Sequence, residues 1–329
     1  MSIKRKEDHI ALTPKAQLDL GQKDSRFNYE PLMSGHLKEL EPFTFLDKQW
    51  NLPIWASSMT GGAQNAKQIN KNIAKVCQKF GMGMGLGSCR SLLDSTAYLK
   101  DFDVRKYIGD DLPLYANLGV GQLEQLISEN KLNKIKDLLD MLSADGLIIH
   151  INPLQELTQE GGDRFQHSPL ASISTLIEKL EVDLIVKEVG QGMGPSSMDA
   201  LLGLPLKGIE FGALGGTNFA LLELLRQESN EYLYPFVKVG HSAEEMVGYY
   251  NNMIQHNDAA KSIDIIISGG IQNYLDGYYL TSKIQSKAVY GQASSLLKYA
   301  KEGYEPLEKY ISNQKHGLEM ANAFLQIKK

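Results

Sequence analysis

The feature of the sequence that most constrains the fold is a regular alternation of short apolar runs with longer segments of helical period. It begins after a polar stretch of about fifty residues. Nine apolar runs have the length of buried strands: Leu52–Ser57, Gly81–Leu86, Leu114–Leu118, Leu147–Ile151, Leu184–Val189, Gly208–Gly212, Pro235–Val239, Ile265–Ser268 and Ala288–Gly291. Between them lie amphipathic segments that predict helices: Asn65–Phe80, Gln122–Leu142, Ala171–Leu180, Phe219–Gln227, Ala243–Ile254 and Ile271–Ile284.

This alternation predicts a parallel sheet, either closed into a (β/α)8 TIM barrel or open and doubly wound. An open dinucleotide-binding sheet usually carries Gly-x-Gly-x-x-Gly after its first strand. The nearest match, Gly83-Met84-Gly85-Leu86-Gly87, has glycine at every second position and follows the wrong strand. Such spacing suits a strand that another group approaches closely or that curves tightly. We therefore predict the closed α/β barrel, in which one run is surplus, and we expect this to be Pro235–Val239.

The chain is predicted to form a single domain. Barrels of this class often reach its length of 329 residues, and no internal repeat, Pro-rich linker or low-complexity tract marks a boundary. We expect residues 1–50 to form an N-terminal arm and lead-in segment packed on the barrel. Residues 51–329 would then form the barrel itself.

Composition excludes several classes of protein. Apolar residues make up 43% and charged residues 22% of the chain, which excludes a disordered or fibrous protein. The net charge is -5 and the basic residues are scattered, so no nucleic-acid partner is indicated. Cys77 and Cys89 lie in no metal-type spacing and are expected to be free thiols. Because no apolar segment approaches membrane-spanning length, we expect a soluble cytoplasmic protein.

Small and polar residues follow almost every predicted strand at its carboxyl end. In a barrel these ends meet on one face, where such enzymes build their active sites. Three of the clusters join a strand to a following segment in a way that suits a phosphate: Gly215-Gly216-Thr217, Ser268-Gly269-Gly270 and Gln292-Ala293-Ser294. Each could also be an ordinary tight turn, but three together at one rim favour a ligand.

Two polar residues lie within apolar strands. Lys187 occurs in LIVKEV, so its ammonium either escapes to solvent at the strand end or is held by an anion or an electron-rich partner. Asn117 occurs in LYANLG, where a buried amide needs a hydrogen-bonding partner. Together these side chains could hold a planar, hydrogen-bonding cofactor.

Two further segments carry charged groups suited to a diphosphate or a cation. Glu156 is a hard oxygen ligand of the kind that Mg²⁺ uses, and Gln155 beside it can only orient a partner. The same residues also fit a helix that starts at Pro153 and places an acidic residue in its first turn. Near the N-terminus, the mixed-charge stretch 5–9 is either a solvated tail or an arm that brings two cations and a histidine to a diphosphate.

These motifs resemble, in order along the chain, those of the type 2 isopentenyl-diphosphate isomerases, which are flavin-dependent enzymes of isoprenoid biosynthesis. The matching segments are RKEDHI at 5–10, SSMTGG at 57–62, FGMGMGLGSCR at 80–90, ANLG at 116–119, HINPLQE at 150–156, EGGDRF at 160–165, VKEVGQGM at 186–193, GALGGTNFA at 212–220 and SGGIQNYLD at 268–276. RKxxH and NPLQE are specific to this family, whereas SGGI is shared with many flavin barrels.

The resemblance implies a TIM barrel that binds FMN at its carboxyl face and interconverts isopentenyl diphosphate and dimethylallyl diphosphate. Reduced FMN would act as an acid/base cofactor, NADPH would serve only to reduce it, and Mg²⁺ would bridge to the diphosphate. The residues implied for FMN are Ser58, Met59, Thr60, Ser88, Asn117, Lys187, Thr217, Gly269, Gly270, Ile271, Ala293 and Ser294. Those implied for the substrate are Arg5, Lys6, His9, Ser88, Arg90, His150, Asn152 and Gln155, with Gln155 and His150 nearest the chemistry.

By the same resemblance, Glu156 would bind the Mg²⁺ ion. The family also implies a homo-oligomer, a tetramer or an octamer, with the N-terminal arm reaching a neighbouring subunit.

The sequence departs from the family pattern at several positions. Val239-Gly240-His241-Ser242-Ala243 stands where relatives carry Trp-Gly-Ile/Val-Pro-Thr, so no role is transferred to that connection. Cys89 replaces the usual glutamine of GSQR, and the acidic loop has an extra glycine in Glu160-Gly161-Gly162-Asp163. Ala293-Ser294-Ser295 replaces a more basic or proline-containing turn, which weakens the phosphate assignment there.

Two other functions fit parts of the same pattern. An FMN-dependent 2-hydroxy-acid oxidase shares the barrel, the strand lysine and the Ser-Gly-Gly turn. It also needs a histidine base followed by Gly-Gly-Arg near the sixth strand, where this chain reads Gly215-Gly216-Thr217-Asn218. The other alternative is a catalytically silent barrel that binds flavin or phosphate.

Overall fold

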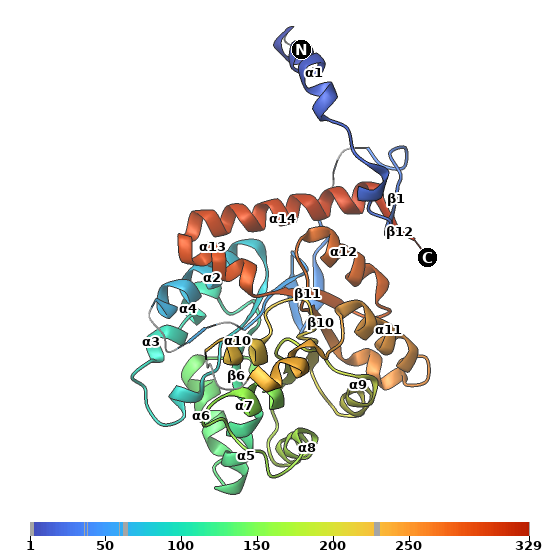
Figure 1. Ribbon diagram of the computed structural model, residues 1–329. Helices are drawn as coiled ribbons and strands as arrows, with labels where there is room; N and C mark the ends of the chain where they lie inside the picture. The colour runs from blue at the N-terminus through green and yellow to red at the C-terminus, as the bar shows by residue number, and fades with distance from the viewer. Residues whose placement is uncertain are drawn as a thin grey trace.

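A computed structural model describes residues 3–35, 37, 39–58, 60–61, 65–226 and 231–328. Within them, eight parallel strands close into a barrel in the order β10-β11-β4-β5-β6-β7-β8-β9 (Figure 1). Their bounds are β4 (Ile54–Ala56), β5 (Gly83–Gly85), β6 (Leu114–Gly119), β7 (Gly146–Ile151), β8 (Leu184–Glu188), β9 (Gly208–Glu210), β10 (Asp264–Ser268) and β11 (Ala288–Gln292). The predicted TIM barrel is therefore confirmed.

The surplus run was identified correctly. Pro235–Val239 overlaps a 3₁₀ helix over Glu231–Lys238 instead of joining the barrel. Pro235 lacks the backbone N–H that a strand needs to pair with its neighbour in a sheet, and its place in a 3₁₀ helix outside the barrel is consistent with this.

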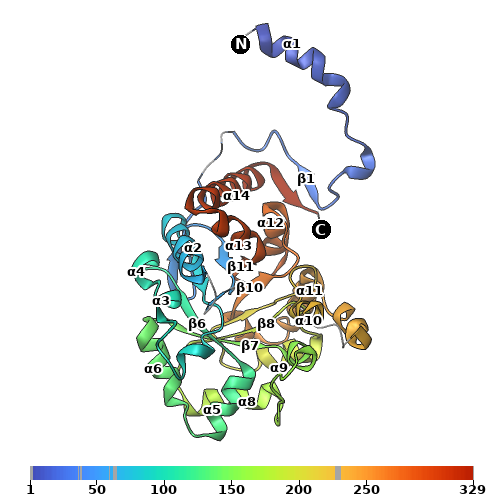
Figure 2. The same cartoon turned by 60° about the vertical axis from the view of Figure 1, so that its left-hand side comes forward.

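Helices surround the barrel (Figures 1 and 2). The main ones are α2 (Ala66–Phe80), α5 (Val120–Ser128), α6 (Asn133–Leu142), α8 (Pro169–Lys179), α9 (Pro195–Leu202), α10 (Phe219–Leu225), α11 (Ala243–Met253), α12 (Tyr274–Lys283), α13 (Ser294–Glu302) and α14 (Tyr304–Phe324). Three short helices, α3 (Leu99–Phe102), α4 (Arg105–Ile108) and α7 (Pro153–Thr158), lie in the connections.

Two predicted helix boundaries were wrong. The segment Gln122–Leu142 forms two helices because Asn130 takes the left-handed conformation, with φ 54°, and turns the chain between α5 and α6. The segment predicted to start at Ile271 becomes helical only at Tyr274. Asn273 fixes that start, since its side chain accepts hydrogen bonds from the backbone N–H groups of Leu275 and Asp276.

An aromatic plug fills the amino-terminal half of the barrel. It centres on the hairpin of β2 (Phe43–Phe45) and β3 (Lys48–Trp50), which inserts Trp50 against Trp55 of β4 with ring centroids 6.1 Å apart. A Cβ atom added at Gly83 would lie 2.6 Å from the Trp50 ring. The alternate glycines of β5 therefore make room for an indole, as their spacing predicted.

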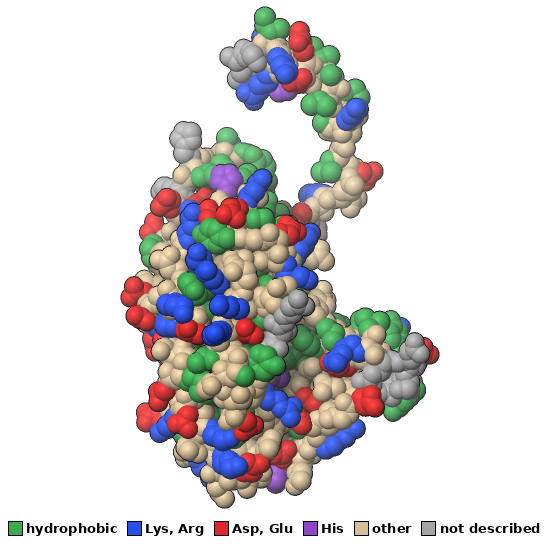
Figure 3. Space-filling model, turned by 90° about the vertical axis from the view of Figure 1, so that its left-hand side faces the viewer, with side chains coloured by type: hydrophobic (Ala, Val, Ile, Leu, Met, Phe, Trp, Pro, Cys, Tyr) green, Lys and Arg blue, Asp and Glu red, His purple; other side chains and the backbone are tan. Residues whose placement is uncertain are grey.

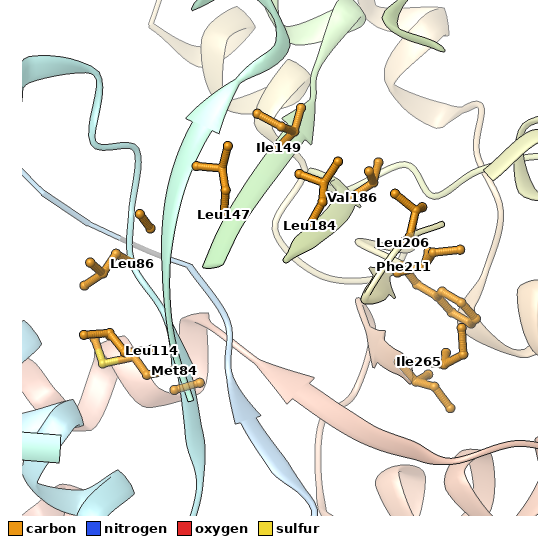
Figure 4. Close-up of a cluster of buried hydrophobic side chains, with 14 of the residues drawn as sticks. Met84, Leu86, Leu114, Leu147, Ile149, Leu184, Val186, Leu206, Phe211 and Ile265 are labelled. Carbon is orange, nitrogen blue, oxygen red and sulfur yellow. The ribbon is translucent and has the colours of Figure 1, made fainter. Parts of the chain in front are cut away.

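Alternate residues of the strands point outward and pack against the helices. Figure 4 shows Leu147 and Ile149 of β7 beside Leu184 and Val186 of β8 in this outer cluster. The residues between them, Ile148 and Ile185, belong to the inner cluster with the plug. This alternation determines which polar residues farther along each strand reach the interior.

A segment near each end of the chain takes part in a two-stranded sheet outside the barrel. β1 (Phe27–Tyr29) pairs antiparallel with β12 (Leu325–Ile327), and Arg26 forms a 2.8 Å ion pair with Asp276 of α12. Before β1, α1 (Ile3–Leu12) has no buried residue and projects away from the barrel (Figures 1 and 2). None of the helices in the described part of the chain has the length and hydrophobicity to cross a membrane.

Candidate active site

A polar layer lies above the aromatic plug, toward the carboxyl ends of the strands. Asn117, His150, Lys187 and Glu210 follow inward-facing positions by two residues on β6, β7, β8 and β9, so they face the same interior. The strand register places His150 beside Lys187 and Lys187 beside Glu210. A row of hydrogen-bonding and charged groups thus lies across four neighbouring strands on the floor of the carboxyl face.

Lys187 stays inside the protein. Its side chain is buried, and Nζ donates a 2.7 Å hydrogen bond to the carbonyl oxygen of Glu188. Of the two predicted arrangements, escape to solvent is therefore wrong and an electron-rich partner is confirmed. The remaining ammonium protons are available to a ligand at the barrel rim.

His150 and Asn117 form a pair in the same layer. His150 Nδ1 lies 2.7 Å from Asn117 Oδ1. With that oxygen accepting, Nδ1 carries the ring proton and Nε2 remains an acceptor. Burial, reinforced by the Lys187 ammonium, lowers the pKa of His150 to about 3. The imidazole is therefore neutral at physiological pH.

A cavity of about 270 Å³ opens above this layer, between the loops that follow β4, β8, β9, β10 and β11. Of the residues implied for FMN, those lining it are Ser58, Lys187, Thr217, Gly269, Gly270, Ile271, Ala293 and Ser294. Thr60, Ser88 and Asn117 do not line it, and Met59 lies outside the described residues. The three predicted phosphate turns thus meet around one cavity.

The glycines of these turns bring backbone very close to backbone. A Cβ atom at Gly269 would lie 2.0 Å from the carbonyl oxygen of Ala213, and one at Gly216 would lie 3.2 Å from the nitrogen of Gly270. Gly215, Gly269 and Gly270 also have positive φ angles of 117°, 94° and 75°. Only glycine allows this close packing of the turns that line the cavity.

The lining of the cavity contains polar atoms that need a partner. Ser57 Oγ, Ser58 Oγ and Gln292 Nε2 are buried and make no hydrogen bond within the described residues. Such groups are costly to leave unpaired, so they indicate that a polar ligand completes the site. A phosphorylated, planar group with hydrogen-bonding edges fits this set of donors and acceptors.

A second polar cluster surrounds α7. As predicted, Pro153 begins the helix and Glu156 lies in its first turn. Asn152 Nδ2 donates to Glu156 Oε1 at 2.8 Å and to Gln155 Oε1 at 3.1 Å, while the backbone N–H of Asp163 donates to Glu156 Oε2 at 2.7 Å. Asn152 Oδ1 is buried without a hydrogen-bond partner in the described structure. These contacts bring the predicted residues of this segment together.

The acidic loop with the additional glycine folds over this cluster. A Cβ atom at Gly162 would lie 2.1 Å from the carbonyl oxygen of Glu156, so the loop can approach only because glycine stands there. Asp163 Oδ2 accepts a 2.7 Å hydrogen bond from Gln122 and lies 3.4 Å from Arg90. No cluster of three His, Cys, Asp or Glu side chains suited to a metal occurs in the described ranges. Any cation here would depend on Glu156 together with neutral oxygens and a ligand.

The other predicted substrate residues lie farther out. Ser88 and Arg90 are exposed beside the loop after β5, whereas the intervening Cys89 is buried and burial raises the pKa of its thiol to about 12. Arg5, Lys6 and His9 lie on the exposed helix α1. The single chain therefore does not bring the arm to the cavity, and Figure 3 shows the arm standing clear of the body.

Sequence reasoning missed three buried polar residues near the cavity. Glu210, only 1% exposed, accepts a 3.3 Å hydrogen bond from Trp55 Nε1. Glu188 and Gln191 are buried in and after β8. A charged residue inside an apolar run was the available signal, and it was applied to Lys187 but not to Glu188 or Glu210.

Comparison with known proteins identifies the family. The chain matches no protein-family model. An isopentenyl-diphosphate delta-isomerase of Rickettsia typhi is 34% identical over 307 residues, which cover 91% of this chain and 86% of the relative. The isopentenyl-diphosphate delta-isomerase of Rickettsia prowazekii is 34% identical over 309 residues with the same coverage.

The chain belongs to the isopentenyl-diphosphate delta-isomerase family. This confirms the resemblance read from the motifs, and it makes the protein an isomerase.

Solved structures agree on the fold of this family member. The flavin-binding domain of baker's yeast flavocytochrome b2 is similar with a TM-score of 0.62 and 12% identity, covering 90% of this chain and 71% of that one. A mandelate oxidase with a monooxide FMN adduct has a TM-score of 0.57 and 11% identity, covering 92% and 88%. At such identities the likeness shows a TIM barrel and nothing of the chemistry.

Proposed function

We propose that this family member interconverts isopentenyl diphosphate and dimethylallyl diphosphate, using reduced FMN as an acid/base cofactor and Mg²⁺ as a bridge to the diphosphate. The observation that carries the proposal is the 34% identity to named isomerases over 91% of the chain. The cavity, with its unpaired polar atoms and glycine turns, supports it independently.

The cavity would hold FMN by its two chemically distinct ends. Backbone N–H groups around Gly215–Thr217 and Gly269–Ile271 would receive the phosphate, while Lys187 and Ser58 would meet polar edges of the ring. Bound reduced flavin would supply an electron-rich surface and a proton donor at N5 for a double-bond shift without net redox change. NADPH would then be required only to reduce the flavin initially.

The cluster around α7 would bind the diphosphate and its cation. Glu156 Oε1 and the unpartnered Asn152 Oδ1 are hard oxygens of the type that Mg²⁺ prefers. Gln155 would lie against the isoprene carbons, and His150 would face the diphosphate from the barrel floor. Because its imidazole is neutral with the proton on Nδ1, His150 can donate from Nε2 to that anion only after gaining a second proton or after changing tautomer, with the Asn117 amide turned to donate to Nδ1.

The remaining cations would come from Arg90 and from the arm. Arg5, Lys6 and His9 lie on the projecting helix α1, so we propose that the arm of one copy completes the site of a neighbour in a homo-oligomer, a tetramer or an octamer. We also propose residues 1–50 as arm and lead-in, residues 51–329 as the FMN-binding barrel, and a cytoplasmic location. Crosslinking and light scattering would test the assembly.

The proposed activity is tested by incubating the purified protein with FMN, Mg²⁺ and NADPH and following both five-carbon diphosphates by NMR. Conversion in both directions supports the isomerase. Absence of conversion by a protein that nevertheless binds FMN favours the catalytically silent barrel. Oxygen consumption with 2-hydroxy acids would instead favour the oxidase, whose required histidine and arginine the Gly215–Asn218 segment lacks.

The proposed cation site is tested with Glu156→Gln. The variant keeps the size of the side chain but loses the charge, so we expect a steep rise in the Mg²⁺ concentration needed for half-maximal activity. FMN affinity should stay unchanged, because Glu156 does not line the cavity. Loss of bound flavin in this variant would show that the role of Glu156 has been misassigned.

A further inference from the structure

The carboxylate of Glu188 holds the loop after β8 in place. Its Oε2 atom accepts hydrogen bonds from three successive backbone N–H groups, those of Gly190 at 2.7 Å, Gln191 at 2.6 Å and Gly192 at 3.0 Å. Gly190 and Gly192 take φ angles of 132° and 69°, which other residues rarely adopt. One buried side chain therefore fixes a conformation that the backbone would not take readily by itself.

The loop that Glu188 holds lies directly against the glycine turn after β9. A Cβ atom at Gly190 would lie 2.3 Å from the carbonyl oxygen of Thr217. The N–H of Gly192 donates to the carbonyl oxygen of Gly212 at 3.0 Å, and the N–H of Phe219 to that of Val189 at 3.4 Å. The two loops thus pack backbone to backbone at both ends of the glycine turn.

The glycine turn after β9 also lies against the turn after β10. Gly215 and Gly216 come within 3.2 Å of Gly270, measured from a Cβ atom added at either position. Displacement of the loop after β8 would therefore pass to both turns that line the cavity. The other cavity group affected is Lys187, whose Nζ donates to the carbonyl oxygen of Glu188.

The same loop also anchors the segment that departs from the family pattern. Gln191 Nε2 donates to the carbonyl oxygens of Phe236 at 3.0 Å and Val239 at 2.6 Å, and its own carbonyl oxygen accepts from His241 N–H at 2.8 Å. A second, mainly apolar cavity of about 530 Å³ is lined by Glu188, Gln191 and this segment. Glu188 therefore lies in the wall between two cavities.

We propose that Glu188 is a positioning residue that shapes the phosphate end of the flavin cavity through the Gly190–Thr217 contact. It acts through the loops, because its Oε2 atom accepts hydrogen bonds from three backbone N–H groups of the loop after β8. The proposal rests on the function proposed above, in which the anion held by the glycine turns is the FMN phosphate. It predicts that the acceptor oxygen matters more than the negative charge.

The test compares the affinities of FMN and riboflavin, which differ only in the phosphate, for the full-length protein and its variants. Glu188→Ala removes the acceptor of the three loop N–H groups. If the displaced turn then loses one hydrogen bond to the charged phosphate, we expect the Kd for FMN to rise about tenfold or more. The Kd for riboflavin should rise less than about threefold by the same reasoning. Glu188→Gln, which retains an acceptor oxygen, should restore most of the FMN affinity.

A matched control is available on α5. Glu124 of α5 also accepts backbone N–H bonds from a loop, those of Gln166 and His167, but it does not line the flavin cavity. Glu124→Ala should leave both affinities unchanged. If Glu188→Ala does not fold, as judged by circular dichroism, Glu188→Asp keeps the charge but draws the carboxylate back from the three N–H groups by one methylene, and it should give the same selective loss.

Two results would overturn the proposed role of Glu188 and leave the proposed function of the protein intact. One is an equal loss of FMN and riboflavin affinity in Glu188→Ala, which would indicate a general structural role. The other is unchanged FMN affinity in the folded variant. A wild-type protein that binds neither flavin would instead overturn the proposed function, and this inference with it.

Discussion

The neutral state of the half-buried His150 leads to a quantitative prediction for stability at acid pH. Its pKa is lowered to about 3 in the folded protein and returns to about 6.5 in the unfolded chain, so the unfolded state binds the proton more tightly. Stability contributed by this difference is present above pH 6.5 and is lost as the pH falls toward 3. Between pH 7 and pH 5 the loss amounts to about 2 kcal/mol from the linkage relation.

Urea unfolding of the wild type and of His150→Gln at pH 7 and pH 5 measures this loss. The variant cannot titrate at position 150, so the wild type should lose about 2 kcal/mol more than the variant between the two pH values. All other histidines are common to both proteins and cancel in the comparison. His256→Gln, at an exposed position, should behave like the wild type.

Equal losses in the wild type and in His150→Gln would refute the reasoning. That result would mean that the imidazole is hydrated or paired in a way that leaves its pKa near the ordinary value. The NMR signal of the His150 ring provides an independent check, because it should not titrate between pH 5 and pH 8.

Three further predictions concern the framework of the site. Trp50→Ala should reduce the free energy of unfolding by about 3–5 kcal/mol because the indole is fully buried in the plug; a loss below about 1 kcal/mol in urea unfolding would contradict this packing. Gly212→Ala should prevent stable folding, measured by circular dichroism, because its Cβ would lie 2.0 Å from the Glu188 carbonyl oxygen at φ 53°. Its control, Gly248→Ala in α11, has open space and should stabilise the protein by about 1 kcal/mol. Removal of residues 1–22 should leave the melting temperature within about 2 °C, because residues 3–22 are all exposed, yet abolish isomerisation; retained activity would refute the role of the arm.

The fold was predictable because its main signals are local. Eight strands could be placed from apolar runs alone, and the glycines of β5 indicated either a close approach or a tight curve, of which the structure shows the close approach. What could not be predicted depends on contacts between distant segments. The hairpin of β2 and β3 lies in a polar stretch, and only the barrel interior shows that Trp50 belongs to the core.

The candidate site was predictable to a similar extent. The glycine turns and Lys187 were found because each is unusual in its own strand or loop. Glu188 carries the same signal, a charged residue in an apolar strand, but its partners are backbone N–H groups of its own loop, and no residue pattern specifies those contacts. The position of the arm relative to the cavity depends on a second copy of the chain, and no local signal specifies it.

The measurement that most directly tests the central claim is the number of diphosphate molecules isomerised for each NADPH oxidised. Without oxygen present, NMR counts the isomerised molecules, and absorbance at roughly 340 nm, where the reduced nicotinamide ring absorbs, follows the NADPH. An isomerase that needs its flavin reduced only once should convert many molecules for each NADPH consumed. A ratio of one, or oxidation of NADPH with no dimethylallyl diphosphate formed, would contradict the account.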